Sequence, residues 1–161
     1  MLIQKLNENW QMCINNTEEF MPAAVPGSVY QDLLDNNKME DPYYRDNELK
    51  ALKIMENDFT YVTCFDVPED IREREEVLLH FDGIDTIGDI YLNGTLLGHV
   101  KNMHRIWEYS VKNLLKPEGN ELKVVLHSPT RFIREAYEER PLEGSSDAMR
   151  GFPYLRKAHC M

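Results

Sequence analysis

The stretch Tyr91-Leu92-Asn93-Gly94-Thr95-Leu96 decides the fold class. Asn-Gly tolerates positive φ at both of its positions, so it predicts a two-residue hairpin turn between two apolar strands. On both sides of this hairpin, further segments repeat with the period of two that strands require. These segments are Phe59-Tyr61-Thr63-Phe65-Val67, Val77-Leu79-Phe81, the residues 106–109, and Leu122-Val124-Leu126, which follows the turn Pro117–Asn120.

Helical signals are few. Ser28 and Gln31 form a capping box, in which the Ser28 hydroxyl takes the N–H of Gln31 and the Gln31 side chain reaches back. That helix should end near Asn36 and Asn37, because Asn commonly ends helices. We expect a short helical piece over 49–55, and a helix over 130–140 with Phe132, Ile133, Ala136 and Tyr137 on one side. We expect residues 1–27 to be irregular.

Short strands with tight turns and no alternation of strands with helices predict one mainly-β domain spanning residues 1–161. The predicted architecture is an antiparallel β-sandwich or jelly roll with a short N-terminal helix. A chain of 161 residues is too short for a (β/α)8 barrel, which takes about 250 residues. Any activity that needs such a barrel must therefore come from residues outside this chain.

Charge and composition limit the partners. The chain carries 18 Lys and Arg against 28 Asp and Glu, a formal net charge of −10, which argues against nucleic acid and anionic membranes as partners. The sequence has no membrane-length apolar run and no signal-peptide pattern. The cysteines Cys13, Cys64 and Cys160 are odd in number and far apart, so we expect reduced thiols and a cytoplasmic protein.

No catalytic or metal-binding motif stands out. The five histidines lack metal-ligand spacing, and neither a CxxC pair nor a G-x-S-x-G elbow is present, so we expect no metal and no cofactor. His80 and His127 fall opposite the apolar positions of strand patterns, where a solvated or hydrogen-bonded histidine is expected. Sequence spacing identifies no pair of carboxylates for acid–base hydrolysis. We therefore assign no catalytic residue within the chain.

The segments Phe81-Asp82-Gly83-Ile84-Asp85-Thr86 and Ile90–Gly94, followed by Gly119-Asn120-Glu121-Leu122, resemble the N-terminal, galactose-binding-domain-like sandwich of glycoside hydrolase family 2. Three further features resemble the β-mannosidase branch of that family. They are Val25-Pro26-Gly27-Ser28-Val29 leading into Asp32-Leu33-Leu34, the segment Asp41-Pro42-Tyr43-Tyr44-Arg45-Asp46-Asn47, and the pair Arg156-Lys157. The resemblance runs from about Trp10 to the end, with Phe59 and His104 departing from residues common there.

The resemblance implies an accessory domain of a retaining exo-β-mannosidase, which removes terminal β-linked mannose. Both catalytic glutamates would lie in a barrel domain of the same polypeptide, so this chain alone is expected to be inactive. The chain ends at Met161, just before the Trp-Asp-Trp-Gly segment that the family would place next. The implied partners are that catalytic barrel and a β-mannoside oligosaccharide.

The resemblance also suggests site residues. Within the loop 43–47, Asn47 offers a donor and an acceptor to a sugar hydroxyl, and Tyr44 offers a stacking surface. The alternative is that Asp46 and Asn47 only cap the helical piece that follows. Arg156 and Lys157 either support the active-site loop that carries the Trp-Asp-Trp segment or face solvent or the next domain.

Two other functions stay open at this point. The same fold serves free-standing carbohydrate-binding modules, although such modules expose aromatic residues and Trp10 and Trp107 are expected to be buried. The domain also occurs in family 2 β-galactosidases and β-glucuronidases. If the chain is one domain of a larger enzyme, an apolar surface should be exposed where the barrel packs.

Overall fold

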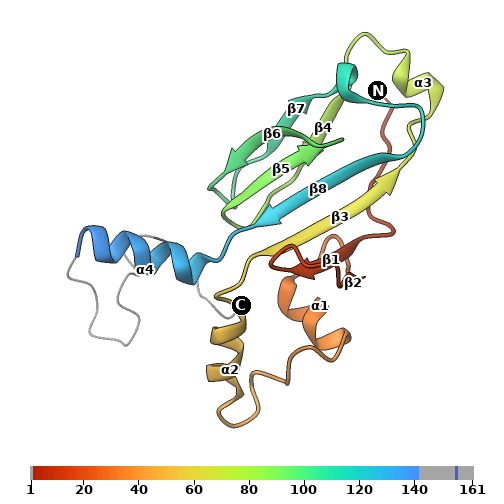
Figure 1. The fold of residues 1–161 in the computed structure, drawn as a ribbon. Coiled ribbons are helices and arrows are strands. Elements are labelled where there is room, and N and C mark those ends of the chain that lie inside the picture. Colours follow the sequence, from red (N-terminus) through yellow and green to blue (C-terminus); the bar gives the residue numbers. More distant parts are fainter. Residues whose placement is uncertain (1, 142–154, 156–161) are drawn as a thin grey trace.

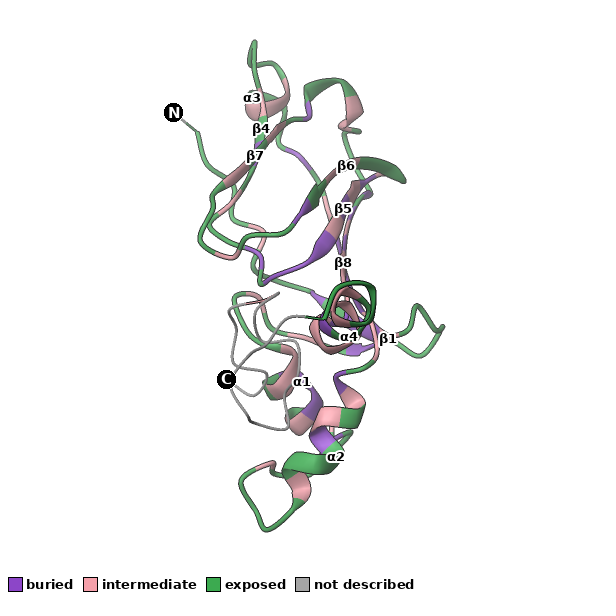
Figure 2. Cartoon of the chain, turned by 90° about the vertical axis from the view of Figure 1, so that its left-hand side faces the viewer, coloured by how far each residue is buried: buried purple, intermediate pink, exposed green. Residues whose placement is uncertain are grey.

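Antiparallel strands form two sheets in the computed structural model, which describes residues 2–141 and 155. Within these residues, six strands make one sheet in the order β2-β1-β3-β8-β5-β6, and β4 pairs with β7 in a second sheet. The bounds are β1 Gln11–Ile14, β2 Met21–Pro22, β3 Phe59–Phe65, β4 Leu78–Phe81, β5 Gly88–Leu92, β6 Thr95–Val100, β7 Trp107–Ser110 and β8 Asn120–Leu126. Figure 2 shows the small sheet lying across from β5 and β6 as a second layer. The predicted mainly-β antiparallel sandwich is confirmed.

The Asn-Gly hairpin joins β5 to β6 as expected, with Leu92 opposite Thr95. Asn93 has φ of 51° and Gly94 has φ of 80°, so both turn residues lie in the left-handed region. A register shift between Ile90 and Tyr91 marks a bulge in the pairing.

Asn93 also holds the hairpin against the neighbouring strand. Its side-chain amide donates to Asn120 Oδ1 at 3.0 Å, and its own Oδ1 accepts the N–H of Glu121 at 3.0 Å. Asn120 is fully buried, and it further accepts the N–H of Lys116 while donating to the carbonyls of Lys116 and Phe65. These bonds give the Asn-Gly and Gly-Asn-Glu motifs a structural explanation.

The expectation that residues 1–27 are irregular is wrong. β1 pairs with the central strand β3, with Met12 opposite Tyr61, and Met12 and Cys13 are fully buried. The turn after β1 uses Asn15 and Asn16, which both have positive φ. β1 could not be predicted from the sequence, because it is only four residues long and its register is fixed by pairing with β3, which is distant in the sequence.

Three of the helices, α1, α2 and α4, lie at one end of the large sheet (Figure 1), where α1 and α2 lie below β1 and α4 points away, whereas α3 lies at the opposite end. Their bounds are α1 Val29–Asp35, α2 Asn47–Ile54, α3 Glu69–Arg72, the 3-10 turn η1 Lys112–Leu114, and α4 Pro129–Glu139. Ser28 caps α1 through the N–H of Gln31, as predicted. The Gln31 side chain donates instead to Asp35, so the reciprocal half of the capping box is wrong.

Of the four residues predicted on one side of α4, Ile133 is buried and Phe132, Ala136 and Tyr137 are half-buried. One expectation about burial needs correction. Trp10 is buried as expected, but Trp107 is only half-buried, with the guanidinium of Arg105 4.6 Å from its ring centroid.

A buried polar contact fixes the helical end to the sheet. Asp32 of α1 is 2% exposed, and its carboxyl accepts the hydroxyl of Tyr61 at 2.6 Å and the N–H of Ala24 at 2.9 Å. Burial and the neighbouring Asp32 raise the pKa of Tyr61 far above its usual value. One clamp therefore joins β3, α1 and the segment that precedes α1.

Candidate functional site

The loop between α1 and α2 is braced by its own hydrogen bonds. The Asp41 side chain accepts the N–H of Tyr43 at 2.9 Å, and the Asp41 carbonyl accepts the N–H of Tyr44 at 3.1 Å. The side-chain amide of Asn47 donates to the same carbonyl at 3.0 Å, and the Asn47 N–H donates to the carbonyl of Tyr44 at 3.2 Å. Arg45, at the apex, has φ of 55°. The segment Asp41–Asn47 is therefore pre-organised, and we call it the tyrosine loop.

The tyrosine loop presents aromatic rings to solvent. Tyr43 is 85% exposed and Tyr44 is 58% exposed. The Arg45 guanidinium carbon lies 5.1 Å from the centroid of the Tyr44 ring, a cation–π contact that covers part of that ring. Planar aromatic surface beside a guanidinium can bind either a sugar ring or a partner protein.

The two predicted sugar-contacting residues do lie together in this loop. Asn47, however, uses its amide nitrogen to close the loop, which leaves its side-chain oxygen as the group without a hydrogen bond to the described residues. The alternative, that Asp46 and Asn47 only cap the following helix, is right about where α2 begins, but neither side chain makes a capping hydrogen bond. Asp46 is the N-cap of α2 and makes no side-chain capping bond, and Asn47 bonds to Asp41 instead of to the helix.

Arg156 and Lys157, the predicted support of the active-site loop, lie outside the described residues. Their role stays a prediction.

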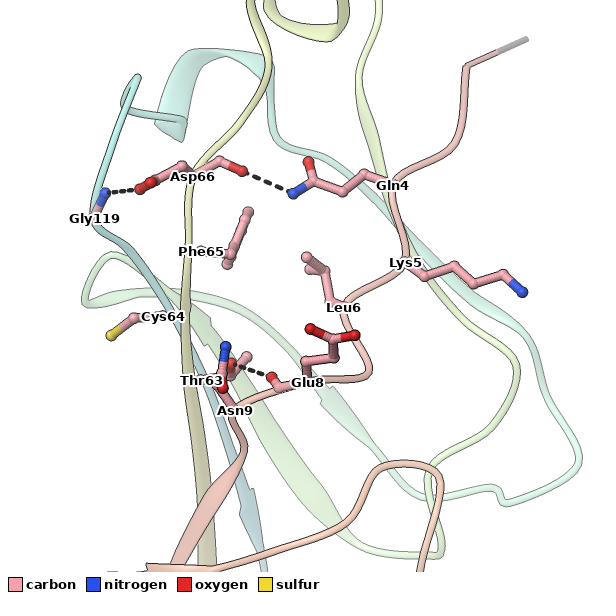
Figure 3. A pocket seen from close by; sticks show the side chains of 10 residues that line it. All are labelled: Gln4, Lys5, Leu6, Glu8, Asn9, Thr63, Cys64, Phe65, Asp66 and Gly119. Atoms are coloured by element: carbon pink, nitrogen blue, oxygen red, sulfur yellow. Dashed lines mark hydrogen bonds between the residues drawn. The ribbon is translucent and has the colours of Figure 1, made fainter.

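A hollow runs between the N-terminal segment and β3 (Figure 3), and its lining comprises Gln4, Lys5, Leu6, Glu8, Asn9, Thr63, Cys64, Phe65, Asp66 and Gly119. Gln4 donates to the carbonyl of Asp66 at 2.8 Å, and Thr63 donates to the carbonyl of Glu8 at 3.1 Å. The Asp66 carboxylate turns away from Glu8 and accepts the N–H of Gly119 (Figure 3). These two acidic groups are therefore not arranged as an acid–base pair, and the hollow is best explained as the seam where the N-terminal segment binds the sheet.

A network of charged residues lies where β8 ends and α4 begins. His127, just after β8, places Nε2 3.0 Å from the Asp89 carboxylate and Nδ1 3.5 Å from that of Asp58. His99 also contacts Asp89, and Arg131 of α4 donates to Asp58. His127 is thus hydrogen-bonded, as the strand pattern predicted, and His80 likewise bonds to Glu108 and Asp82.

This network lowers the pKa of both Asp58 and Asp89. Burial opposes the ionisation of Asp58, but the N–H of Ser128 and the Arg131 guanidinium outweigh it and hold the pKa of Asp58 below its usual value. For Asp89, burial is likewise outweighed by His127 and His99, and its pKa is lowered too. Since these charges pair with one another around the start of α4, the network ties that helix to the sheet. Sequence analysis missed it, because its members are 10 to 73 positions apart.

The described residues show neither a metal-binding cluster nor a membrane-spanning helix. No group of three or more His, Cys, Asp or Glu side chains among them is placed to hold a metal ion. None of the helices described has the length and apolar character that crossing a membrane requires.

Comparisons with known proteins place the chain in a domain family of glycosyl hydrolase 2 enzymes. The family model described as glycosyl hydrolase 2 galactose-binding domain-like matches residues 10–161. The chain is 31% identical to a β-mannosidase of Mus musculus over 96% of its own length, and 38% identical to β-mannosidase B of Aspergillus terreus over 67%. It spans 18% and 13% of those two relatives.

Solved structures of related enzymes have the same fold. The crystal structure of a β-D-mannosidase from Dictyoglomus thermophilum superimposes with a TM-score of 0.86 and 35% identity, covering 91% of this chain and 18% of that one. A β-glucuronidase from Bifidobacterium dentium shares the fold at a TM-score of 0.59 and 23% identity, covering 76% of this chain and 19% of the other. The chain therefore belongs to the galactose-binding domain-like family of glycosyl hydrolase 2 enzymes.

Proposed function

We propose that this chain is the N-terminal domain of a retaining exo-β-mannosidase that removes terminal β-linked mannose from oligosaccharides. One observation carries the proposal: similarity to a β-mannosidase structure extends over 91% of this chain at 35% identity. The chain spans only 18% of that protein, so the activity would belong to a longer polypeptide. A cytoplasmic location stays a prediction.

Within that polypeptide, the domain acts as an accessory. The catalytic glutamates lie in a separate barrel domain, and residues 1–161 form a single sandwich that packs against it and walls the sugar pocket. The arrangement of Glu8 and Asp66 in the hollow of Figure 3 supports this division, because it offers no acid–base pair. On this proposal the domain is inactive by itself.

The tyrosine loop is the part of the domain that approaches sugar. Asn47 accepts a sugar hydroxyl through its side-chain oxygen, and Tyr44 supplies an aromatic or hydroxyl contact. Arg156 and Lys157 support the loop that lines the active site. No catalytic residue and no cofactor are assigned to this chain.

The test is a hydrolysis assay on the full polypeptide encoded by the gene. We expect turnover of an aryl β-mannoside, little turnover of the matching β-glucuronide and β-galactoside, and none by residues 1–161 alone. A preference for the β-glucuronide or β-galactoside would assign the domain to another branch of the family. Measurable hydrolysis by residues 1–161 would refute the accessory role.

Asn47 can be tested in the same assay. Asn47→Asp removes the donor that closes the loop but keeps an oxygen acceptor, whereas Asn47→Ala removes both. If the oxygen binds sugar, Asn47→Ala should lower kcat/KM at least tenfold more than Asn47→Asp. Equal losses would assign Asn47 to loop structure alone.

The exposed tyrosines favour a second candidate, a free-standing carbohydrate-binding module. A stop codon directly after Met161, together with saturable binding of mannan to the isolated chain, would establish this alternative. An open reading frame that continues for several hundred codons would exclude it.

A further inference from the structure

We propose that Tyr43 and Arg45 are the contacts through which this domain docks onto the rest of its own polypeptide, at an apolar pocket bordered by a carboxylate. The inference rests on the proposed function only in treating the chain as one domain of a longer protein. It adds the contact residues and the chemistry of the surface that receives them.

Tyr43 is exposed without being loosely held. Its side chain is 85% exposed, yet its N–H donates to the Asp41 side chain at 2.9 Å, and two further bonds to the Asp41 carbonyl close the loop. Pre-organisation of this kind lowers the entropy lost on binding. A large apolar ring on a rigid loop has the properties of an interface anchor.

Arg45 supplies the charged half of the contact. Among the described residues it forms no ion pair, although the nearby Lys50 is paired with Glu40. Its guanidinium lies against the Tyr44 ring, so Tyr43 has the more accessible aromatic surface of the pair. Tyr and Arg are among the residue types most enriched in the contacts that dominate binding energy, and Arg favours a carboxylate partner.

The rest of the polypeptide is the occupant that these observations favour. The chain spans 18% of both the mouse and the D. thermophilum β-mannosidases, so a much longer polypeptide is available to cover this surface. A second copy is disfavoured, because this chain has a net charge of −10 and the loop itself carries Asp41 and Asp46. A sugar is disfavoured as the ligand of Arg45 and Tyr43 because a neutral pyranose leaves the guanidinium charge unpaired.

Photo-cross-linking in the full polypeptide tests the proposal. Benzoylphenylalanine is incorporated at position 43, and in a matched control at Leu78, which is 47% exposed. Leu78 belongs to β4, a strand that lies away from the end of the molecule formed by α1 and α2 (Figure 1). Irradiation of position 43 should give cross-links within one molecule to peptides outside residues 1–161. Adding R45E should reduce their yield about tenfold, whereas position 78 should give no such cross-links.

Three results would overturn the proposal: cross-links only between copies, cross-links only to added mannobiose, or a yield at position 43 no higher than at position 78. A polypeptide that ends at residue 161 would also overturn it. Cross-linking needs no turnover, so its failure in an active β-mannosidase refutes only the docking contact. Successful docking in a polypeptide without β-mannosidase activity refutes only the proposed function.

Discussion

Removing one buried hydroxyl should show how firmly the helical end is joined to the sheet. The Tyr61 hydroxyl donates to Asp32 at 2.6 Å, and both side chains are buried. A hydrogen bond to a charged group contributes about 1.5–3 kcal/mol, and Tyr61→Phe leaves the Asp32 carboxyl with the N–H of Ala24 as its remaining partner among the described residues. We expect the free energy of unfolding to fall by about 1.5–3 kcal/mol, and Tm by about 3–12 °C for a chain of this length.

Urea unfolding followed by circular dichroism measures this change. Tyr91→Phe is the matched control, since the Tyr91 hydroxyl makes no hydrogen bond to the described residues and its ring contacts Lys123. The control should change stability by less than about 0.5 kcal/mol. A double-mutant cycle with Asp32→Asn isolates the pair, and the coupling energy should fall between about 0.5 and 3 kcal/mol.

Equal destabilisation by Tyr61→Phe and Tyr91→Phe would contradict a stabilising role for the Tyr61–Asp32 hydrogen bond. A double-mutant cycle without coupling would contradict it too. In either case the attachment of α1 would depend on apolar packing, for instance of the fully buried Leu33, and not on the polar clamp.

Three further outcomes follow from the same contacts. Because the pKa of Tyr61 is raised in the folded state, the free energy of unfolding should fall as pH rises above about 10, by up to about 1.4 kcal/mol per pH unit. In urea titrations, Tyr61→Phe should make this decline less steep. The lowered pKa of Asp58 contributes stability above pH 3.8 that disappears as pH falls below it, so Asp58→Asn should unfold at lower urea than wild type at pH 7 and differ less from it at pH 2.5. Asn120→Ala should lower the free energy of unfolding by about 3–5 kcal/mol, because this buried side chain makes four hydrogen bonds, whereas Asn102→Ala at an exposed position should lower it by less than about 1 kcal/mol.

Sequence analysis succeeded where structure is determined locally. The Asn-Gly turn needs only two adjacent residues that accept positive φ, and it is present as predicted. The cap at Ser28 and the helix that begins at Pro129 likewise depend on residues within one helical turn. Strands of seven residues, such as β3 and β8, show enough alternation to be recognised.

It failed where distant residues decide the outcome. The register of β1 is set by β3, and the Asp58–His127–Asp89 network brings together residues 38 and 69 positions apart. For the candidate site, the resemblance singled out the loop 43–47 and named Tyr44 and Asn47, whose contact with sugar stays a prediction. It missed Tyr43, because no local pattern tells that one of two adjacent tyrosines will be 85% exposed.

The motifs behind the resemblance divide into two kinds. Asn93, Asn120 and Asp32 are explained by bonds inside the domain, because each satisfies groups on a neighbouring strand or segment. Tyr43 has no such role for its side chain, so Tyr43→Ala should leave the unfolding free energy of residues 1–161 within about 0.5 kcal/mol of wild type. The same substitution should destabilise the full polypeptide if docking buries the ring, as differential scanning calorimetry of both proteins would show. Equal effects in both would mean that the ring acts within the domain, and the tyrosine loop would then lose its claim to be a docking contact.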